Sequence, residues 1–134
     1  MTDSAPQQPD ADVIALAGKL FDAARAGDHA LLAAYLDAGA PADLANDLGD
    51  TLVMLAAYHG HAESVRTLIA HGADPDRVND RGQTPLAGAV FKGEPAVIDA
   101  LLAGGADPQA GTPSALDTAR MFGKEDLAAR FESR

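Results

Sequence analysis

The sequence predicts an all-α protein made of about four helix–turn–helix repeats, and three observations lead to this prediction. First, 30 of the 134 residues are alanine and 15 are leucine, a composition that suits helices packed closely together. Second, β-branched and aromatic residues are few, which argues against a β-sandwich or β-barrel. Third, glycine, alanine and threonine recur at one constant interval along the chain.

Several unrelated residue types keep the same interval of about 33 residues, which chance would not produce. The series are Gly27, Gly60 and Gly93; Gly39, Gly72 and Gly105; Ala23, Ala56 and Ala89; and Thr51 and Thr84. Self-similarity at a fixed period indicates a repeat array, in which each unit buries its apolar face against its neighbours. Each unit is predicted to contain two short antiparallel helices, a tight turn between them and a longer, hairpin-like turn after them.

The first repeat is expected to open with a helix over residues 13–27, which are rich in alanine and leucine. This helix starts near Asp12, and Asp10 or Asp12 is its expected N-cap, because a short acidic side chain can accept hydrogen bonds from the free N–H groups of the first turn. It reaches further upstream than the first helices of the inner repeats.

The second repeat is the clearest of the four. Residues 51–59 and 61–71 each carry apolar side chains at helical spacing. Gly60 and Gly72 end these two helices, since glycine readily adopts the left-handed conformation that follows a helix. The next segment, 73–83, holds Pro, Asn, Asp and Gly, which is turn chemistry.

The third and last repeats follow the same order. Helices are expected over 85–92 and 94–103, and a final helix over 124–132. The last repeat is shortened, because Gly123 follows Gly93 sooner than the interval of the inner repeats would place it. Charged residues on the final helix can face water, as the end of a repeat array requires.

The domain organisation predicted from these patterns is one repeat domain after a short tail. Residues 1–10 are polar, acidic and proline-bearing and predict a disordered tail. The repeat domain covers 11–134, with repeats at about 14–46, 47–79, 80–110 and 111–134.

Composition also excludes several classes of protein. The net charge of −10 disfavours nucleic acid and anionic membranes as partners. No apolar run approaches the length of about 18 residues that a membrane span needs, and the N-terminus does not have the pattern of a secretory signal. We therefore expect a cytoplasmic protein. The absence of cysteine excludes a disulfide framework, a thiol nucleophile and a cysteine zinc site.

The repeats resemble ankyrin repeats. The segments that carry the resemblance are DLGDTLVMLAAYHGHAESVRTLIAHGADP at 47–75 and DRGQTPLAGAVFKGEPAVIDALLAGGADP at 80–108. They depart from the family at Met54 and Ala87, where ankyrin repeats usually have a histidine that joins a hydrogen-bond network between repeats. The sequences of the repeats are also similar to those of small stand-alone bacterial ankyrin proteins. The resemblance implies an ankyrin solenoid and a module that binds a partner protein without catalysis.

In ankyrin arrays the partner contacts the tips of the longer turns and the exposed face of the first helices. By position, Arg25, Tyr58, Phe91 and Met121 recur near the end of each first helix, once in every repeat. We call these four residues the ladder. Aromatic residues, Met and Arg are enriched in protein interfaces. The other residues expected to bind the partner are His59 and Lys92 beside the ladder, and Leu48, Asp50, Arg77, Arg81 and Gln83 at the turn tips.

Three questions about this surface stay open at the level of sequence. Tyr58 and Phe91 could be interface residues or half-buried residues that cover a neighbouring repeat. Arg77 and Arg81 could pair with Asp47 or Asp50 across adjacent tips, or with acidic groups of a partner. The same face could also bind a second copy of the chain and make a structural homodimer.

Candidate residues for chemistry are few, and each has a simpler explanation. His59, His61, Glu63 and His71 lie close in sequence, but Gly60 separates two helices there, and a zinc site needs three or four converging ligands. The recurring aspartates of the longer turns are expected to bond their own backbone. Neither a phosphate-binding loop nor a nucleophile motif is present. The sequence therefore predicts a protein that is not an enzyme and that needs no metal or cofactor.

Overall fold

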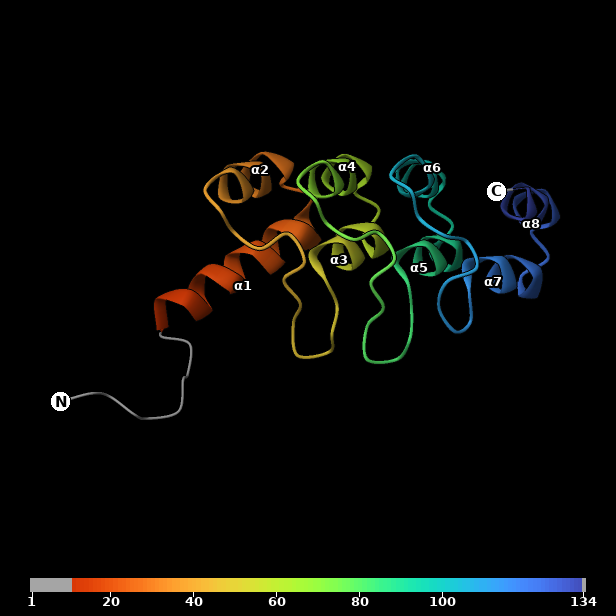
Figure 1. The fold of residues 1–134 in the computed structure, drawn as a ribbon, viewed down its shortest axis with the longest axis horizontal. Coiled ribbons are helices and arrows are strands. Elements are labelled where there is room, and N and C mark those ends of the chain that lie inside the picture. Colours follow the sequence, from red (N-terminus) through yellow and green to blue (C-terminus); the bar gives the residue numbers. More distant parts are fainter. Residues whose placement is uncertain (1–10, 134) are drawn as a thin grey trace.

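The computed structural model describes residues 11–133, which fold into eight helices arranged as four antiparallel pairs (Figure 1). The pairs are α1 Ala11–Ala26 with α2 His29–Asp37, α3 Leu52–Tyr58 with α4 Ala62–Ala70, α5 Pro85–Lys92 with α6 Pro95–Ala103, and α7 Ala115–Met121 with α8 Glu125–Glu132. The predicted all-α class is confirmed. Among the described residues, no helix is both long and apolar enough to cross a lipid bilayer.

The helices form two rows. Figure 1 shows the first helix of each pair (α1, α3, α5 and α7) in one row and the second helices in the other, with the longer turns projecting away from the second row. Along the first row, α1 packs on α3, α3 on α5 and α5 on α7, and along the second row α2 packs on α4 and α4 on α6. The array is therefore one-dimensional, since each pair contacts its neighbours.

Hydroxyl side chains begin three of the four first helices. Thr51, Thr84 and Ser114 each accept a hydrogen bond from the backbone N–H three residues later, at 3.1, 3.1 and 3.0 Å. All three are buried. The recurrence of threonine at the repeat interval is thus explained by N-capping, which satisfies N–H groups that water cannot reach.

The start of α1 differs from the prediction. The helix begins at Ala11, so Asp12 lies inside the first turn and the expectation that it caps the helix is wrong. A carboxylate in the first turn still interacts favourably with the partial positive charge of the helix N-terminus. The other candidate cap, Asp10, and the tail predicted over 1–10 lie outside the described residues.

Small side chains separate the first helices. Ala23, Ala56, Ala89 and Ala119 occupy the same position in successive first helices and are at most 4% exposed. A larger side chain at this position would force neighbouring helices apart, because the interior is filled by contacts from both sides. The alanines found by their spacing in the sequence are the contact points of the stack.

Aspartates in the longer turns link one repeat to the next. The carboxylate of Asp43 accepts a hydrogen bond from the backbone N–H of Asp74, and Asp76 accepts one from Asp107, both at 2.8 Å. The prediction that the turn aspartates bond their own backbone holds for Asp74, which accepts a hydrogen bond from the Asp76 N–H at 2.9 Å. It is wrong for Asp43 and Asp76, whose carboxylates bond the backbone of the next repeat. Burial raises the pKa of Asp76, while its bond from the Asp107 N–H acts in the opposite direction.

Two histidines add contacts between repeats. His61 Nε2 lies 2.7 Å from the carbonyl oxygen of Arg25, and this ring also fills the space beside Gly27. A Cβ at Gly27 would lie 2.5 Å from His61 Nδ1, and the residue has φ of +79°, so only glycine fits there without strain. His71, at the end of α4, reaches both its own helix and α2.

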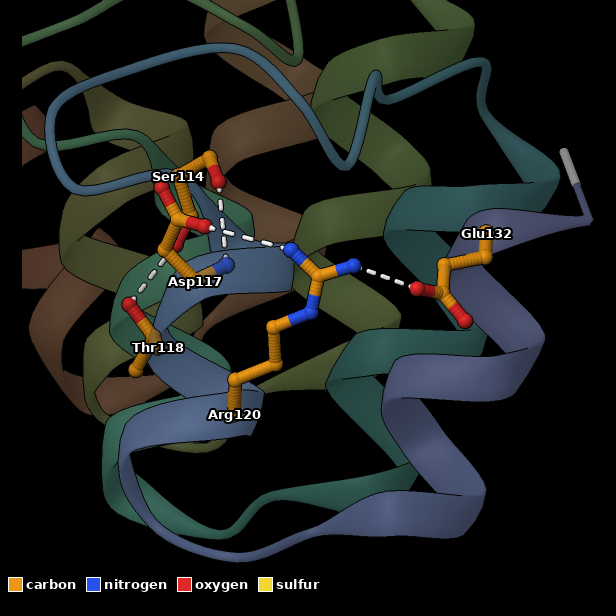
Figure 2. Close-up of polar contacts among 5 residues, drawn as sticks. All are labelled: Ser114, Asp117, Thr118, Arg120 and Glu132. Atoms are coloured by element: carbon orange, nitrogen blue, oxygen red, sulfur yellow. Dashed lines mark hydrogen bonds and ion pairs between the residues drawn. The ribbon is translucent and has the colours of Figure 1, made fainter.

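Polar contacts also hold the last helix pair together. Arg120 in α7 forms ion pairs with Asp117 in the same helix, at 3.7 Å, and with Glu132 in α8 (Figure 2). Arg130 in α8 pairs with Asp99 in α6 at 2.8 Å. These exposed pairs lie on the last two helix pairs, α5–α6 and α7–α8.

Replacing a stacking alanine should loosen the array. We expect Ala56→Leu to lower the free energy of unfolding by about 1–3 kcal/mol, because the added carbons must displace buried neighbours. Urea unfolding followed by circular dichroism measures this change. Ala70→Leu is the control, because Ala70 is exposed on α4 and its substitution should change stability by less than about 0.5 kcal/mol. Equal midpoints for the two variants would contradict the stacking role of Ala56.

The His71 side chain should make stability depend on pH. Its Nδ1 lies 2.8 Å from the Thr67 carbonyl oxygen and its Nε2 lies 2.8 Å from an Asp37 carboxylate oxygen. Only the protonated ring can donate both bonds, and the Thr67 carbonyl followed by Asp37 raises the pKa of His71 above its ordinary value of 6.5. This stabilisation is complete below the unfolded-state pKa and is lost as pH rises through the higher folded-state pKa.

The variant His71→Gln should lack this part of the pH dependence. Urea unfolding of wild type and variant from about pH 5.5 to 8.5 measures it as a difference between two slopes. His29→Gln is the matched control, because His29 is exposed and its ring makes no hydrogen bond to another described residue. If His71→Gln and wild type keep a constant difference across this range, His71 does not carry the effect.

Candidate protein-binding surface

A groove of about 700 Å³ runs between the first helices and the tips of the longer turns. It brings together nine of the eleven residues that the sequence predicts as partner-binding. These are Arg25, Leu48, Asp50, Tyr58, His59, Arg81, Gln83, Phe91 and Met121. Arg77 and Lys92 do not line the groove.

The ladder forms one side of the groove. Tyr58, Phe91 and Met121 are 40, 58 and 68% exposed, so all three reach the surface. Tyr58 is also partly covered by the next repeat, since Lys92 lies over its ring. Each lies near the end of its first helix, because stacked repeats bring equivalent positions to the same side of the array. Arg25 takes the same place on α1, and its guanidinium pairs with Asp22 at 3.1 Å.

Ring contacts extend the ladder toward the C-terminus. Phe91 meets Phe122 edge to face, with ring centroids 5.6 Å apart. Lys92 Nζ lies 4.8 Å from the centroid of the Tyr58 ring, a cation–π contact between successive repeats. Lys92 therefore acts on the groove through Tyr58, although it does not itself line it.

The opposite side of the groove is formed by the turn tips, which two asparagines hold in shape. Asn46 accepts hydrogen bonds from the backbone N–H groups of Leu48 and Asp50, at 2.9 and 3.0 Å. Asn79 accepts the equivalent bonds from Arg81 and Gln83, at 2.9 and 3.1 Å. The exposed side chains of Leu48 and Arg81 thus stand on turns fixed by side-chain bonds.

Of the two pairings expected for Arg77 and Arg81, the one with aspartates of the adjacent turn tip is wrong. Arg77 and Arg81 form no ion pair with another described residue, so neither Asp47 nor Asp50 is their partner. Instead Asn79 donates a hydrogen bond to the Asp50 carboxylate at 2.9 Å and occupies that acceptor. The neutral amide of Asn79, on a shorter side chain, therefore contacts Asp50 in place of the arginine guanidinium.

The floor of the groove was not predicted. It includes Met54, which is almost completely buried, together with Ala87 and Gly88. A Cβ at Gly88 would make ordinary contacts with Tyr58 and Met54, at 3.7 and 3.8 Å, so the missing side chain leaves room beside the ladder. The recurrence of Asn46 and Asn79 at the repeat interval was a usable signal in the sequence. So was the departure from the usual histidine at Met54 and Ala87, since these equivalent positions both lie on the floor.

The groove is electrically balanced in a strongly acidic protein. Its lining holds two arginines, Arg25 and Arg81, and two aspartates, Asp50 and Asp80, whereas the whole chain has a net charge of −10. An apolar strip between mixed charges is the usual anatomy of a protein interface, in which charged residues lie at the rim.

The histidines do not converge on one point. His61 and His71 contact backbone and side chains of the preceding repeat, and His59 lies beside Tyr58 with ring centroids 5.9 Å apart. Within residues 11–133, no group of three or more His, Asp or Glu side chains is placed to hold a metal ion.

Comparison with known proteins agrees with this architecture. Residues 20–112 match the family model described as ankyrin repeats in three copies. An ankyrin repeat protein of Pseudomonas aeruginosa is 48% identical over 66 residues, which cover 49% of this chain and 39% of that relative. The match to this relative therefore spans about two fifths of its length. Because the family model covers more than half of the sequence and the helices stack in the expected order, the chain belongs to the ankyrin repeat family.

Proposed function

We propose that the protein binds a partner protein in the groove, without catalysing a reaction and without a cofactor. Ankyrin repeats are generally protein–protein interaction modules. The observation that carries the proposal for this chain is the ladder, whose Tyr58, Phe91 and Met121 stay exposed along one side of a groove. Exposing several large apolar side chains side by side on a folded domain is typical of an interaction site.

The partner proposed from this surface presents apolar side chains with mixed charges around them. Tyr58 and Phe91 would be buried in the complex, and Arg81 and Asp80 would act at the rim, where charge changes association rate and partner choice more than affinity. We further propose that residues 11–134 act as one repeat domain with the four repeats predicted above, that the protein works in the cytoplasm of a bacterium, and that it binds neither nucleic acid nor membranes.

Removing the ladder aromatics should abolish partner binding and leave the fold intact. We expect Tyr58→Ala combined with Phe91→Ala to weaken binding by at least about 2 kcal/mol, because such residues dominate interface energies. Affinity capture from the native cells, followed by mass spectrometry and titration of the captured protein, measures the loss. Val78→Ala is the matched control, because Val78 is exposed but lies outside the groove.

A second variant adds bulk where the first removes it. Gly88→Leu places a side chain on the groove floor, and Gly88 has an ordinary helical backbone, so the substitution is tolerated by α5. Both variants should keep the helical circular dichroism spectrum of the wild type and lose the same partner. A partner retained by both would place its binding site outside the groove.

The alternative proposal is that the same face binds a second copy of the chain. In that case the combined Tyr58→Ala and Phe91→Ala variant would be monomeric at concentrations where the wild type is dimeric. Sedimentation velocity of the purified protein distinguishes the two proposals. If the partner is a different protein, the double substitution does not change the oligomeric state of the purified chain.

A further inference from the structure

The N-terminal half of α1, residues 11–19, presents a second exposed apolar surface. Val13, Ile14 and Leu16 are 54, 59 and 36% exposed. Among the described residues, nine large apolar side chains are exposed, of which five line the groove and these three lie on α1. The helix has 16 residues, whereas α3, α5 and α7 have 7 or 8, and Figure 1 shows it running out beyond the two rows.

This surface continues the stripe that α1 uses to pack on the array. Val13, Leu16 and Leu20 are spaced i, i+3 and i+7, which places them on one face of the helix. Leu20 is buried in the core, whereas every residue from 11 to 16 is exposed.

We propose that this face of α1 binds the same face of a second copy of the chain, with the two helices antiparallel. Asp12 and Lys19 are seven residues apart, so both lie on the same flank of the stripe. Neither forms an ion pair with another described residue. In an antiparallel pair, Asp12 of each copy comes level with Lys19 of the other, which gives two ion pairs across the twofold axis.

The apolar residues fit the same alignment. With Asp12 opposite Lys19, Leu16 of each copy lies within one helical turn of Val13 of the other, and the small Ala17 beside them allows close approach. A parallel pair offers neither match, because each residue then lies level with its own copy and Asp12 stays seven residues from Lys19.

The contact is short, so the dimer is weak. Nine residues of helix extend about 13 Å, and the area they bury is below the roughly 800 Å² per partner of a standard interface. The two copies, each with a net charge of −10, also repel each other. Salt at about 0.15 M largely screens this repulsion. Dissociation in the micromolar range is therefore expected, and the groove stays open in the dimer.

Sedimentation velocity of the full chain at about 5–500 µM in about 0.15 M salt tests the proposal. We expect a reversible monomer–dimer equilibrium, and Leu16→Asp should raise its dissociation constant by about tenfold or more, because a carboxylate would be buried at the centre of the contact. Val78→Asp, which adds the same charge to another exposed apolar position, should leave the equilibrium unchanged. So should the combined Tyr58→Ala and Phe91→Ala variant, which separates this interface from the groove.

Exchanging the flanking charges tests the antiparallel register. Asp12→Lys alone and Lys19→Asp alone each bring like charges together twice per dimer and should weaken it by about fivefold. The double variant D12K/K19D restores opposite charges and should recover the wild-type constant. A wild type that stays monomeric at the highest concentration, a dimer insensitive to Leu16→Asp, or a double variant weaker than both single variants would each overturn the proposal.

Discussion

Alanine at one position of each first helix sets the distance between neighbouring repeats. Ala23, Ala56, Ala89 and Ala119 are buried, and a first helix in the middle of the array packs on two others. A repeat of about 33 residues cannot bury its own apolar face, so the fold exists only if its units approach closely enough to share one core. The hydrogen bonds that Asp43, Asp76, His61 and His71 make between repeats depend on this spacing, because each reaches a group that the stacking has already brought near.

The groove is a consequence of the same stacking. A side chain near the end of a first helix recurs one repeat later, and close stacking sets the copies side by side. At the position of Tyr58, Phe91 and Met121 these side chains are large, so the regularity that builds the core also builds an exposed apolar strip. The groove lining has as many aspartates as arginines in a protein of net charge −10. The bulk of the negative charge therefore lies outside the groove, so it would not oppose a partner of the kind proposed above.

The fold and nine of the 19 groove-lining residues could be predicted from the sequence, because stacked repeats bring equivalent positions to the same side of the array. The helix over 85–92 and the equivalent placement of Tyr58 and Phe91 needed only the spacing of equivalent residues. The exposure of these two side chains did not follow from the spacing, which left an interface role and half-buried packing both open. Features that depend on competition between neighbours could not be predicted. Asn79 reaches Asp50 where an arginine was expected, and Arg77 lies outside the groove, because side-chain reach in a turn is not periodic. The shape of the groove floor could not be predicted either, because the equivalent positions Met54 and Ala87 carry side chains of different volume.

Asn46 and Asn79 fix the shape of each turn tip from within, and the two tips also bond each other through Asn79 and Asp50. Each asparagine binds two backbone N–H groups of its own turn, so the local shape is set within five residues and does not require the side chains at the apex. Leu48 and Arg81 can therefore be exchanged without disturbing the stack beneath them. The binding specificity of this scaffold could therefore be changed by substituting the outward-facing residues of the tips at 46–50 and 79–83. Asn46, Asn79, Gly49 and Gly82 would be kept, because they set the shape of the two turns.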